Sequence, residues 1–186
     1  MPIRKQRFRV LGIDPGTNHT GFAIVDHDFD TQETNVVTAF TIDRIYLLQQ
    51  KPWLVETYGE RETAVLGYAD VFRWLLDTYS PDAVITEAPF MGRFPKAFAA
   101  LVELVTSFRN TSMTWDCTIA FQTVQPTAVK KSVGAVVSRD KNDMRNAMLA
   151  ANLLSDILLE DLDEHAVDAV CVCLHLIKEN SSIINT

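Results

Sequence analysis

The sequence predicts an α/β fold in which a mixed sheet, an antiparallel three-strand meander plus parallel strands, is flanked by helices. Three apolar runs at 8–14, 21–26 and 36–42 are separated by short polar turns, a pattern typical of an antiparallel meander. From residue 62 onward, segments with helical periodicity alternate with short apolar runs, which indicates parallel strands joined by helices. Strands first and alternating units afterwards favour a mixed α/β sheet.

Each element of the second half has its own local signal. Residues 62–79 place apolar side chains on one helical face, and a Ser-Pro-Asp turn at 80–82 ends that helix. The run 83–86 is a buried-type strand that leads directly to Glu87, and Pro126 suits the first turn of a short helix. The remaining expected elements are a helix at 96–108, a strand at 119–124 and helices at 142–159 and 164–178.

The chain has 186 residues, of which 47 % are hydrophobic and 22 % are charged. Domains of ~150 residues are common, so we expect a single domain over residues 1–186 that begins with a basic arm at 1–9. The longest wholly apolar run, 169–174, is far shorter than the ~20 residues that cross a bilayer, and no secretory signal follows the basic start. The three cysteines, an odd number, fit a reducing compartment. We therefore expect a soluble intracellular protein without a membrane segment.

The charge distribution is uneven along the chain. The net charge of −7 argues against a nucleic-acid partner when it is taken alone. However, residues 1–9 carry four basic and no acidic side chains, and residues 88–145 carry eight basic against four acidic ones, which leaves −15 for the rest. A phosphate-binding face needs locally positive potential and not a positive total. The pattern therefore permits DNA binding, although on charge alone solvated helix faces are the simpler explanation.

Four residues are candidate metal ligands. Asp14 and Glu87 each follow a predicted buried strand, and His165 and Asp168 lie three residues apart on one face of a predicted helix. Acidic groups at strand ends can converge with such a pair on a hard cation, since Mg²⁺ binds a few carboxylates plus water and substrate phosphate. Two such ions roughly 4 Å apart activate a water and stabilise the leaving oxygen of a phosphodiester. Taken singly, Asp14 and Glu87 also fit turn or cap carboxylates, and His165 fits a histidine at a helix end.

Four motifs, in order, resemble the RuvC family of Holliday-junction resolvases. They are LGIDPGTNHTGFAIVD, VITEAPF, VKKSVG and EHAVDAVCV, and the resemblance runs from about residue 8 to residue 176. It implies a ribonuclease-H-like fold and a homodimer. It also implies a crossover junction endodeoxyribonuclease, a hydrolase that nicks opposed strands of four-way (Holliday) junctions with Mg²⁺, by the two-metal hydrolysis described above.

The resemblance assigns roles to the candidate ligands. Asp14, Glu87 and Asp168 match the catalytic, metal-binding carboxylates of the family. His165 falls where many members have an aspartate and some have a histidine. Because imidazole suits transition metals better than it suits Mg²⁺, we expect Mn²⁺ to substitute for Mg²⁺.

The resemblance also implies a DNA-binding set. Phe90, three residues after Glu87, falls where the family has an aromatic that stacks on bases near the branch. It lies in a proline-bounded segment that predicts an exposed loop suited to base stacking; the alternative is that Phe90 is buried above the sheet. The expected basic contacts are Arg93 and Lys96 beside this loop, and Lys130, Lys131 and Lys141, which match a basic region near the scissile phosphate.

Two features depart from the family pattern. The histidine at position 165 lowers the negative charge of the site, and the segment 43–59 is an extended loop, longer than in typical bacterial members. The long loop is typical of virus-encoded members, some of which also cut forks, flaps and other branched DNA. We therefore expect a protein of DNA recombination and repair in the cytoplasm of a bacterial cell or of a virus-infected host cell.

Alternatives stay open for the function and for one ligand. The DPGT segment at 14–17 also resembles the phosphate loop of actin-like ATPases and sugar kinases, although those proteins need two such domains. A catalytically silent branched-DNA-binding protein is a further interpretation, but all four ligand positions hold residues able to bind metal. If His165 only caps its helix, then Asp161, Asp163 or Glu164 supplies the fourth ligand.

The predicted helix at 96–108 is apolar nearly all round. A helix of this kind needs two burial partners, and we expect these to be its own sheet and the twin helix of a second subunit. A two-fold dimer also places two sites on a two-fold junction, as paired nicks require. The alternative is that residues 43–59 cover the second face within one chain.

Overall fold

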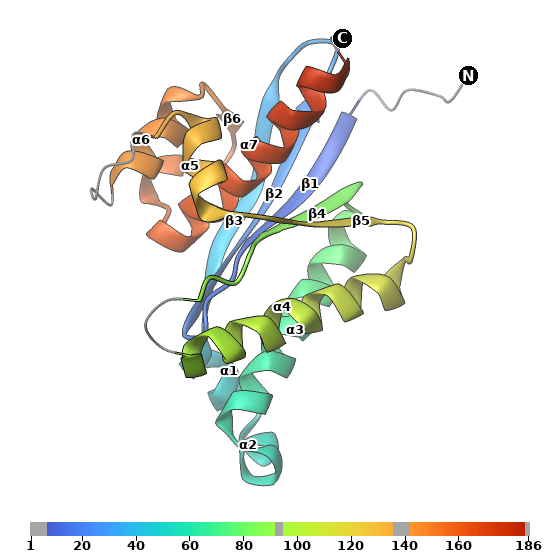
Figure 1. The fold of residues 1–186 in the computed structure, drawn as a ribbon, viewed down its shortest axis with the longest axis vertical. Coiled ribbons are helices and arrows are strands. Elements are labelled where there is room, and N and C mark those ends of the chain that lie inside the picture. The colour runs from blue at the N-terminus through green and yellow to red at the C-terminus, as the bar shows by residue number, and fades with distance from the viewer. Residues whose placement is uncertain (1–6, 92–94, 136–141, 185–186) are drawn as a thin grey trace.

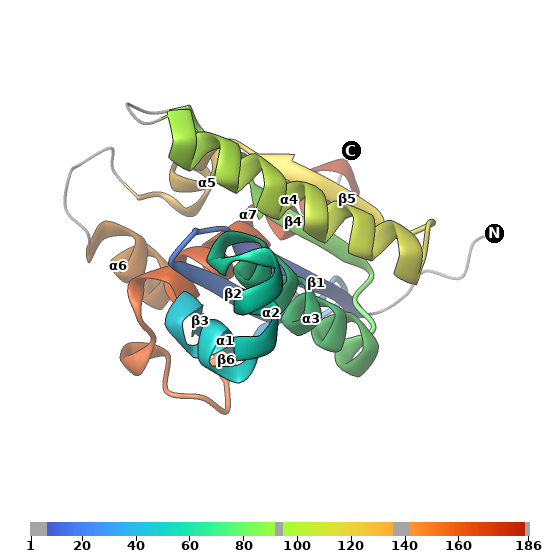
Figure 2. The same cartoon turned by 90° about the horizontal axis from the view of Figure 1, so that it is seen from below.

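The computed structural model describes residues 7–91, 95–135 and 142–184. In these residues one six-stranded sheet runs in the order β5-β4-β1-β2-β3-β6, with helices on both of its faces (Figure 1, Figure 2). The strands are β1 (Arg7–Asp14), β2 (His19–Asp28), β3 (Thr34–Asp43), β4 (Ala83–Glu87), β5 (Ala120–Val124) and β6 (Leu154–Ser155). The helices are α1 (Arg44–Gln50), α2 (Pro52–Tyr58), α3 (Glu60–Tyr79), α4 (Pro95–Trp115), α5 (Pro126–Val133), α6 (Asn142–Ala150) and α7 (Glu164–Ile184), with a short 3-10 turn η1 (Leu159–Asp161).

The first three strands form the predicted antiparallel meander. β1 pairs with β2 from Arg7↔Asp28 to Asp14↔Gly21, and β2 pairs antiparallel with β3. β4 lies parallel to β1, and β5 lies parallel to β4. The expected mixed sheet flanked by helices is therefore confirmed, and β6 adds two residues in parallel at the outer edge of β3.

Alternate side chains of the central strands contribute to two separate cores. Val10 of β1 packs in the core that α5, α6 and α7 share with the sheet, whereas Leu11 packs in the core formed with α3 and α4. Both side chains are fully buried. Because helices cover both faces, the central strands are continuously apolar and do not alternate with polar residues. Cys171 and Cys173 of α7 are buried free thiols of the first core.

Two glycines let α7 lie directly on the sheet. A Cβ atom at Gly12 would lie 2.4 Å from the carbonyl oxygen of Ala169, and one at Gly21 would lie 2.0 Å from the carbonyl oxygen of His165. A side chain at either position would push the helix away from the strands. The first turn of α7 is thereby held against β2, next to the end of β1.

The segment 43–59, expected to be an extended loop, forms two short helices. The Asp43 carboxylate begins α1 by accepting a hydrogen bond from the backbone nitrogen of Ile45 at 2.5 Å, and Pro52 occupies the first turn of α2. Both helices pack against α3, and α2 lies at the far end of the molecule in Figure 1. The expectation of a loop is wrong because a helix of seven residues is too short to show a clear apolar period and depends on tertiary packing.

The helix expected at 142–159 ends at Ala150. Asn152 adopts a left-handed φ of 51°, which ends the helical run, and the chain then pairs as β6 with β3. The Arg145 guanidinium of α6 donates a hydrogen bond to the carbonyl of Glu160 at 2.6 Å. The helical expectation is therefore wrong beyond α6, because a long-range contact and an edge strand replace the local pattern.

The other predicted elements occur at their expected places, with small differences at their ends. The helix expected at 96–108 continues to Trp115, and Ser80 ends α3 in a left-handed conformation with a φ of 46°. The expected arm at 1–9 is described only from Arg7, where it is already part of β1. Within the described residues, no helix combines the length and the apolar character needed to cross a membrane.

Candidate active site

Two of the predicted carboxylates stand side by side at one edge of the sheet. Asp14 is the last residue of β1 and Glu87 is the last residue of β4. The two strands are parallel neighbours, and their pairing runs up to Ile13↔Thr86, one residue before each carboxylate. The strand register alone therefore brings Asp14 and Glu87 together.

The first turn of α7 brings the other two predicted ligands to the same edge. His165 Nδ1 lies 2.8 Å from Asp14 Oδ2, across 151 positions of sequence. Nδ1 of His165 can donate to the carboxylate in this contact, which leaves Nε2 of a neutral ring unprotonated and 4.0 Å from Glu164 Oε1. This hydrogen bond raises the pKa of His165, against the lowering effect of burial. Asp168 follows one helical turn later and is half-buried.

The carboxylates repel one another in a poorly solvated place. Burial, together with the charges of Asp14 and Asp168, raises the pKa of Glu87 to about 8. Burial and the charge of Asp14 raise the pKa of Asp168 to about 6, while Lys130 and His165 act in the opposite direction. Ionised together, these carboxylates would carry more negative charge than the neighbouring cation Lys130 compensates.

Of the predicted basic residues in the described part of the chain, Lys130 is the one whose charge acts on these carboxylates. Its charge lowers the pKa of both Glu87 and Asp168. It also lines a polar cavity of about 330 Å³ between α5, α6 and α7, together with Asp168 and Arg145. An exposed cation beside a carboxylate cluster is suited to hold a phosphate group that approaches the cluster.

The start of α7 is fixed by residues other than His165. The Asp163 carboxylate accepts hydrogen bonds from the backbone nitrogen of Ala166 at 3.0 Å and from the Thr41 hydroxyl at 2.6 Å. Burial by itself raises the pKa of Asp163, but these hydrogen bonds bring it below its ordinary value. Asp163 thus acts as the helix cap, the role that the alternative interpretation assigned to His165.

His19 is a neighbour of the site that the sequence analysis missed. Its ring stacks on the His165 ring, with centroids 5.5 Å apart and an interplanar angle of 21°. Its Nδ1 lies 3.2 Å from Asp43 Oδ2. His19 belongs to the motif LGIDPGTNHTGFAIVD, but nothing in its spacing distinguishes it, because its partners lie 24 and 146 positions away.

The predicted DNA-binding residues do not all lie together. Phe90 is 69 % exposed directly after β4, and Lys131 is exposed on α5 next to Lys130. Lys96 lies at the start of α4 and lines a different cavity, between α3 and α4. The remaining two predicted contacts, Arg93 and Lys141, lie outside the described residues.

The donor set has the chemistry of an open cation site. Asp14, Glu87 and Asp168 offer hard carboxylate oxygens, and His165 offers one imidazole nitrogen. In the part of the chain that the structure describes, no group of three or more His, Cys, Asp or Glu side chains forms a cage that could hold a metal ion. Mg²⁺ does not need such a cage, because it keeps several water or phosphate ligands.

Comparison with known proteins identifies the family. Residues 10–175 match the family model "Crossover junction endodeoxyribonuclease RuvC". A protein of that name from Xanthomonas euvesicatoria pv. vesicatoria (strain 85-10) is 33 % identical over 85 residues, which are 46 % of this chain and 42 % of that relative. The aligned region thus spans less than half of the relative's length.

Solved structures of resolvases share the fold. T. thermophilus RuvC in complex with a Holliday junction substrate matches with a TM-score of 0.68 and 16 % identity, over 90 % of this chain and 92 % of that one. The yeast mitochondrial Holliday junction resolvase matches with a TM-score of 0.65 and 12 % identity, over 95 % of this chain and 80 % of that one. Since the family model covers most of the chain, this protein belongs to the RuvC family of crossover junction endodeoxyribonucleases.

Proposed function

We propose that the protein is a metal-dependent, structure-selective endonuclease that nicks opposed strands of four-way junctions and also cuts other branched DNA such as forks and flaps. The observation that carries the proposal is the cluster of Asp14, Glu87 and Asp168 at one desolvated sheet edge, where the pKa of Glu87 rises to about 8. Acidic groups held together against their own repulsion are typical of a site that receives a cation. Membership of the RuvC family supports the same activity.

The proposed cofactor is a pair of Mg²⁺ ions in each site, for which Mn²⁺ substitutes. Dependence on a divalent cation is a property of the family. Such ions, when bound, activate a water and stabilise the leaving oxygen of a phosphodiester. The three carboxylates and the imidazole of His165 fit this group by their chemistry, since Mg²⁺ prefers carboxylate oxygens and Mn²⁺ also accepts nitrogen.

The proposed work of the chain's own residues follows from their placement. Asp14, Glu87 and Asp168 would hold the cations in their ionised forms, which the raised pKa values of Glu87 and Asp168 oppose until a cation arrives. His165 donates a hydrogen bond from its Nδ1–H group to Asp14 and offers Nε2 as the fourth ligand atom. Lys130 holds the phosphate at the mouth of the site. All of these groups sit on strand ends or helices, which keeps them in place without the substrate.

The proposed DNA contacts flank this site. Phe90 stacks on an unpaired base near the branch, and its 69 % exposure supports that role over burial in the core. Lys131 extends the positive surface of α5 beyond Lys130. Lys96, Arg93 and Lys141 complete the proposed set of contacts.

We also propose a homodimer that pairs through α4. Its buried side chains face the sheet and α3, while Val102 is 40 % exposed and Met113 is 60 % exposed on its outer side. The segment 43–59, the alternative cover, packs as α1 and α2 against α3. A second copy of α4 then remains the partner that this surface fits, and it would bring two nicking sites into a two-fold arrangement.

A side-by-side cleavage assay tests the proposed function. A labelled four-way junction, a fork, a flap and a linear duplex are incubated with the protein in Mg²⁺, in Mn²⁺ and after chelation. We expect paired nicks in the junction, cutting of the fork and the flap, an intact duplex and no product after chelation. Cleavage that survives chelation would contradict the metal dependence.

Two further measurements separate the alternatives. Junction binding without cutting in either metal would favour a silent branched-DNA-binding protein, and ATP hydrolysis by the pure protein would favour the phosphate-loop ATPase. Light scattering at micromolar concentration tests the dimer, because a monomer mass would overturn it.

A further inference from the structure

His19 lies between the candidate site and the helical segment 43–59. It is the first residue of β2, and its side chain is 48 % exposed. One face of its ring stacks on His165 of α7, with ring centroids 5.5 Å apart. The two rings come from elements that are distant in sequence, so their stacking is a product of the tertiary structure.

Asp43 holds the His19 ring in place. Asp43 Oδ2 lies 3.2 Å from His19 Nδ1, and the two residues are also paired across β2 and β3. The Oδ1 atom of the same carboxylate accepts the hydrogen bond from the backbone nitrogen of Ile45 that begins α1. A further backbone hydrogen bond, from Arg44 to the carbonyl of Asn18, joins the start of α1 to the turn before β2 at 2.8 Å. The position of His19 is therefore fixed from both its backbone and its side chain.

The His165 ring needs such a support. The torsion that turns a histidine ring about its Cβ–Cγ bond is broad, so the ring plane is set by its neighbours and not by the rotamer alone. Asp14 holds one atom of the ring, Nδ1, at 2.8 Å. One hydrogen bond fixes a point but leaves the plane free to tilt, whereas a stacked ring on one face restricts that tilt.

We propose that His19 is a positioning residue of the active site: clamped by Asp43, its ring fixes the plane of the His165 imidazole and with it the direction in which Nε2 of His165 is offered. His19 acts through its aromatic face and touches neither substrate nor cation. Removal of a residue that orients a metal ligand without binding the metal typically lowers metal affinity about 10–100-fold. The proposal rests on the proposed metal-dependent function.

The first test uses the metal-free protein. Nitrogen-15 NMR at a pH where the ring is neutral reports which nitrogen of His165 carries the proton. We expect the wild type to show the Nδ1-protonated form, His19→Ala to show a mixture of the two forms, and His19→Phe, which keeps a flat ring, to restore the single form. Asp43→Asn, which retains a helix cap, is expected to give a mixture as well.

The second test measures Mn²⁺ binding by electron paramagnetic resonance in the absence of DNA. We expect the Kd of His19→Ala to rise about ten-fold and that of His19→Phe to stay within about two-fold of wild type. His165→Ala serves as the reference for complete loss of the nitrogen ligand. Thermal unfolding checks each variant, and if His19→Ala does not fold, His19→Phe and Asp43→Asn decide the question.

Each outcome separates the two proposals. A His19→Ala protein with wild-type Mn²⁺ affinity and a single His165 form overturns the positioning role. Equal losses in His19→Ala and His19→Phe also overturn it, because they would assign the role to the ring nitrogens of His19. If the wild type binds no Mn²⁺, the proposed metal-dependent function fails, while the NMR comparison still decides whether His19 orients His165.

Discussion

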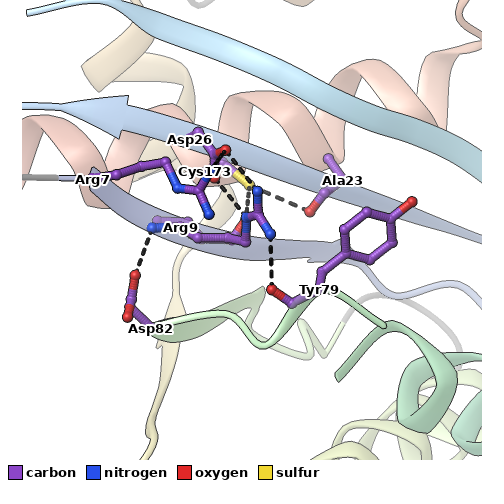
Figure 3. A network of polar contacts seen from close by, with 8 residues as sticks. Arg7, Arg9, Ala23, Asp26, Tyr79, Asp82 and Cys173 are labelled. Atoms are coloured by element: carbon purple, nitrogen blue, oxygen red, sulfur yellow. Dashed lines mark hydrogen bonds and ion pairs between the residues drawn. The ribbon is translucent and has the colours of Figure 1, made fainter. Parts of the chain in front are cut away.

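The two ends of β1 carry buried or half-buried charges in opposite arrangements. At the start of the strand, the Arg9 guanidinium donates to both carboxylate oxygens of Asp26, at 2.7 and 2.8 Å, and to the carbonyl of Tyr79 at 3.0 Å (Figure 3). At the end of the same strand, Asp14 meets Glu87 and Asp168, whose pKa values are raised by burial and by the charges of neighbouring carboxylates. One end pairs unlike charges, and the other collects like charges.

Hydrogen bonds at the Arg9 end of β1 join this strand to Asp82, the residue before β4. The backbone nitrogen of Arg9 donates to Asp82 Oδ2 at 2.9 Å (Figure 3). The backbone nitrogen of Asp82 in turn donates to the Arg9 carbonyl at 2.8 Å. The hydrogen bond to Asp26 raises the pKa of Arg9, so this contact favours the charged guanidinium. Paired charges of this kind satisfy the fold by themselves, whereas uncompensated like charges indicate that a component from outside the chain completes them.

Substitutions that neutralise a carboxylate at the Asp14 end of β1 are expected to have the largest effect on cleavage. Asp14→Asn, Glu87→Gln or Asp168→Asn should each lower the rate of junction cleavage by at least about 10³-fold, because a hard anionic ligand is lost. Junction binding, measured in Ca²⁺ by gel shift, should persist because the phosphate contacts lie elsewhere. Near-normal nicking in Mg²⁺ by any one variant would remove that residue from the proposed ligands.

Breaking the paired end should affect stability and leave the chemistry intact. Arg9→Met leaves the Asp26 carboxylate, which is 11 % exposed, without its bidentate partner, and should lower the free energy of unfolding by about 3 kcal/mol. The matched control is Arg7→Met, since Arg7 is 61 % exposed and 3.5 Å from Asp26, and should cost less than about 1 kcal/mol. Urea unfolding measures both. A large loss of cleavage per folded molecule in Arg9→Met would contradict the assignment of stability to the Arg9 end of β1 and of catalysis to the Asp14 end.

Removing the exposed aromatic beside the acidic end should weaken catalysis on branched DNA. Phe90→Ala removes a stacking surface worth ~1–3 kcal/mol per base, so we expect about a ten-fold loss of junction cleavage and an unchanged Tm. Trp74→Ala is the control, because Trp74 is 52 % exposed and packs against Tyr79 near the paired end. A fall of several degrees in the Tm of Phe90→Ala would instead favour burial of Phe90.

The pH dependence of stability should reveal the acidic end in the metal-free protein. The pKa values of Glu87 and Asp168 lie at about 8 and about 6, above their ordinary values of 4.5 and 3.8. The folded protein therefore binds these protons more tightly than the unfolded chain, so their contribution favours folding in acid and is lost as the pH rises from about 4 to about 8.

The corresponding measurement is thermal unfolding between pH 5 and pH 8.5 in the presence of a chelator. We expect the Tm to fall by about 10 °C over this range, and Glu87→Gln to remove most of that fall, because Glu87 has the larger shift in pKa. Added Mg²⁺ should restore stability at the alkaline end, because a cation favours the ionised carboxylates. A wild-type profile that matches that of Glu87→Gln would contradict the raised pKa of Glu87.

The sequence was sufficient to predict where the candidate carboxylates lie, but not which residues pack around them. Asp14 and Glu87 could be placed at strand ends because each closes an apolar run, and the parallel register of β1 and β4 brings them together as expected. The pairing of the two candidate ligands on α7, His165 and Asp168, follows from a spacing of three residues on one helical face. His19 and Asp43 could not be found in this way, because a stacked ring and an ion pair leave no periodic trace in the sequence.

The sequence by itself determined the fold class and the order of the strands in the meander. These follow from local rules, since alternation, helical period and turn residues act over a few positions. The tertiary structure decided that 43–59 is helical, that the helix from Asn142 stops at Ala150, and that His19 meets His165. These outcomes depend on contacts between residues far apart in the chain. Such contacts outweigh local propensity, and local sequence patterns do not reveal them.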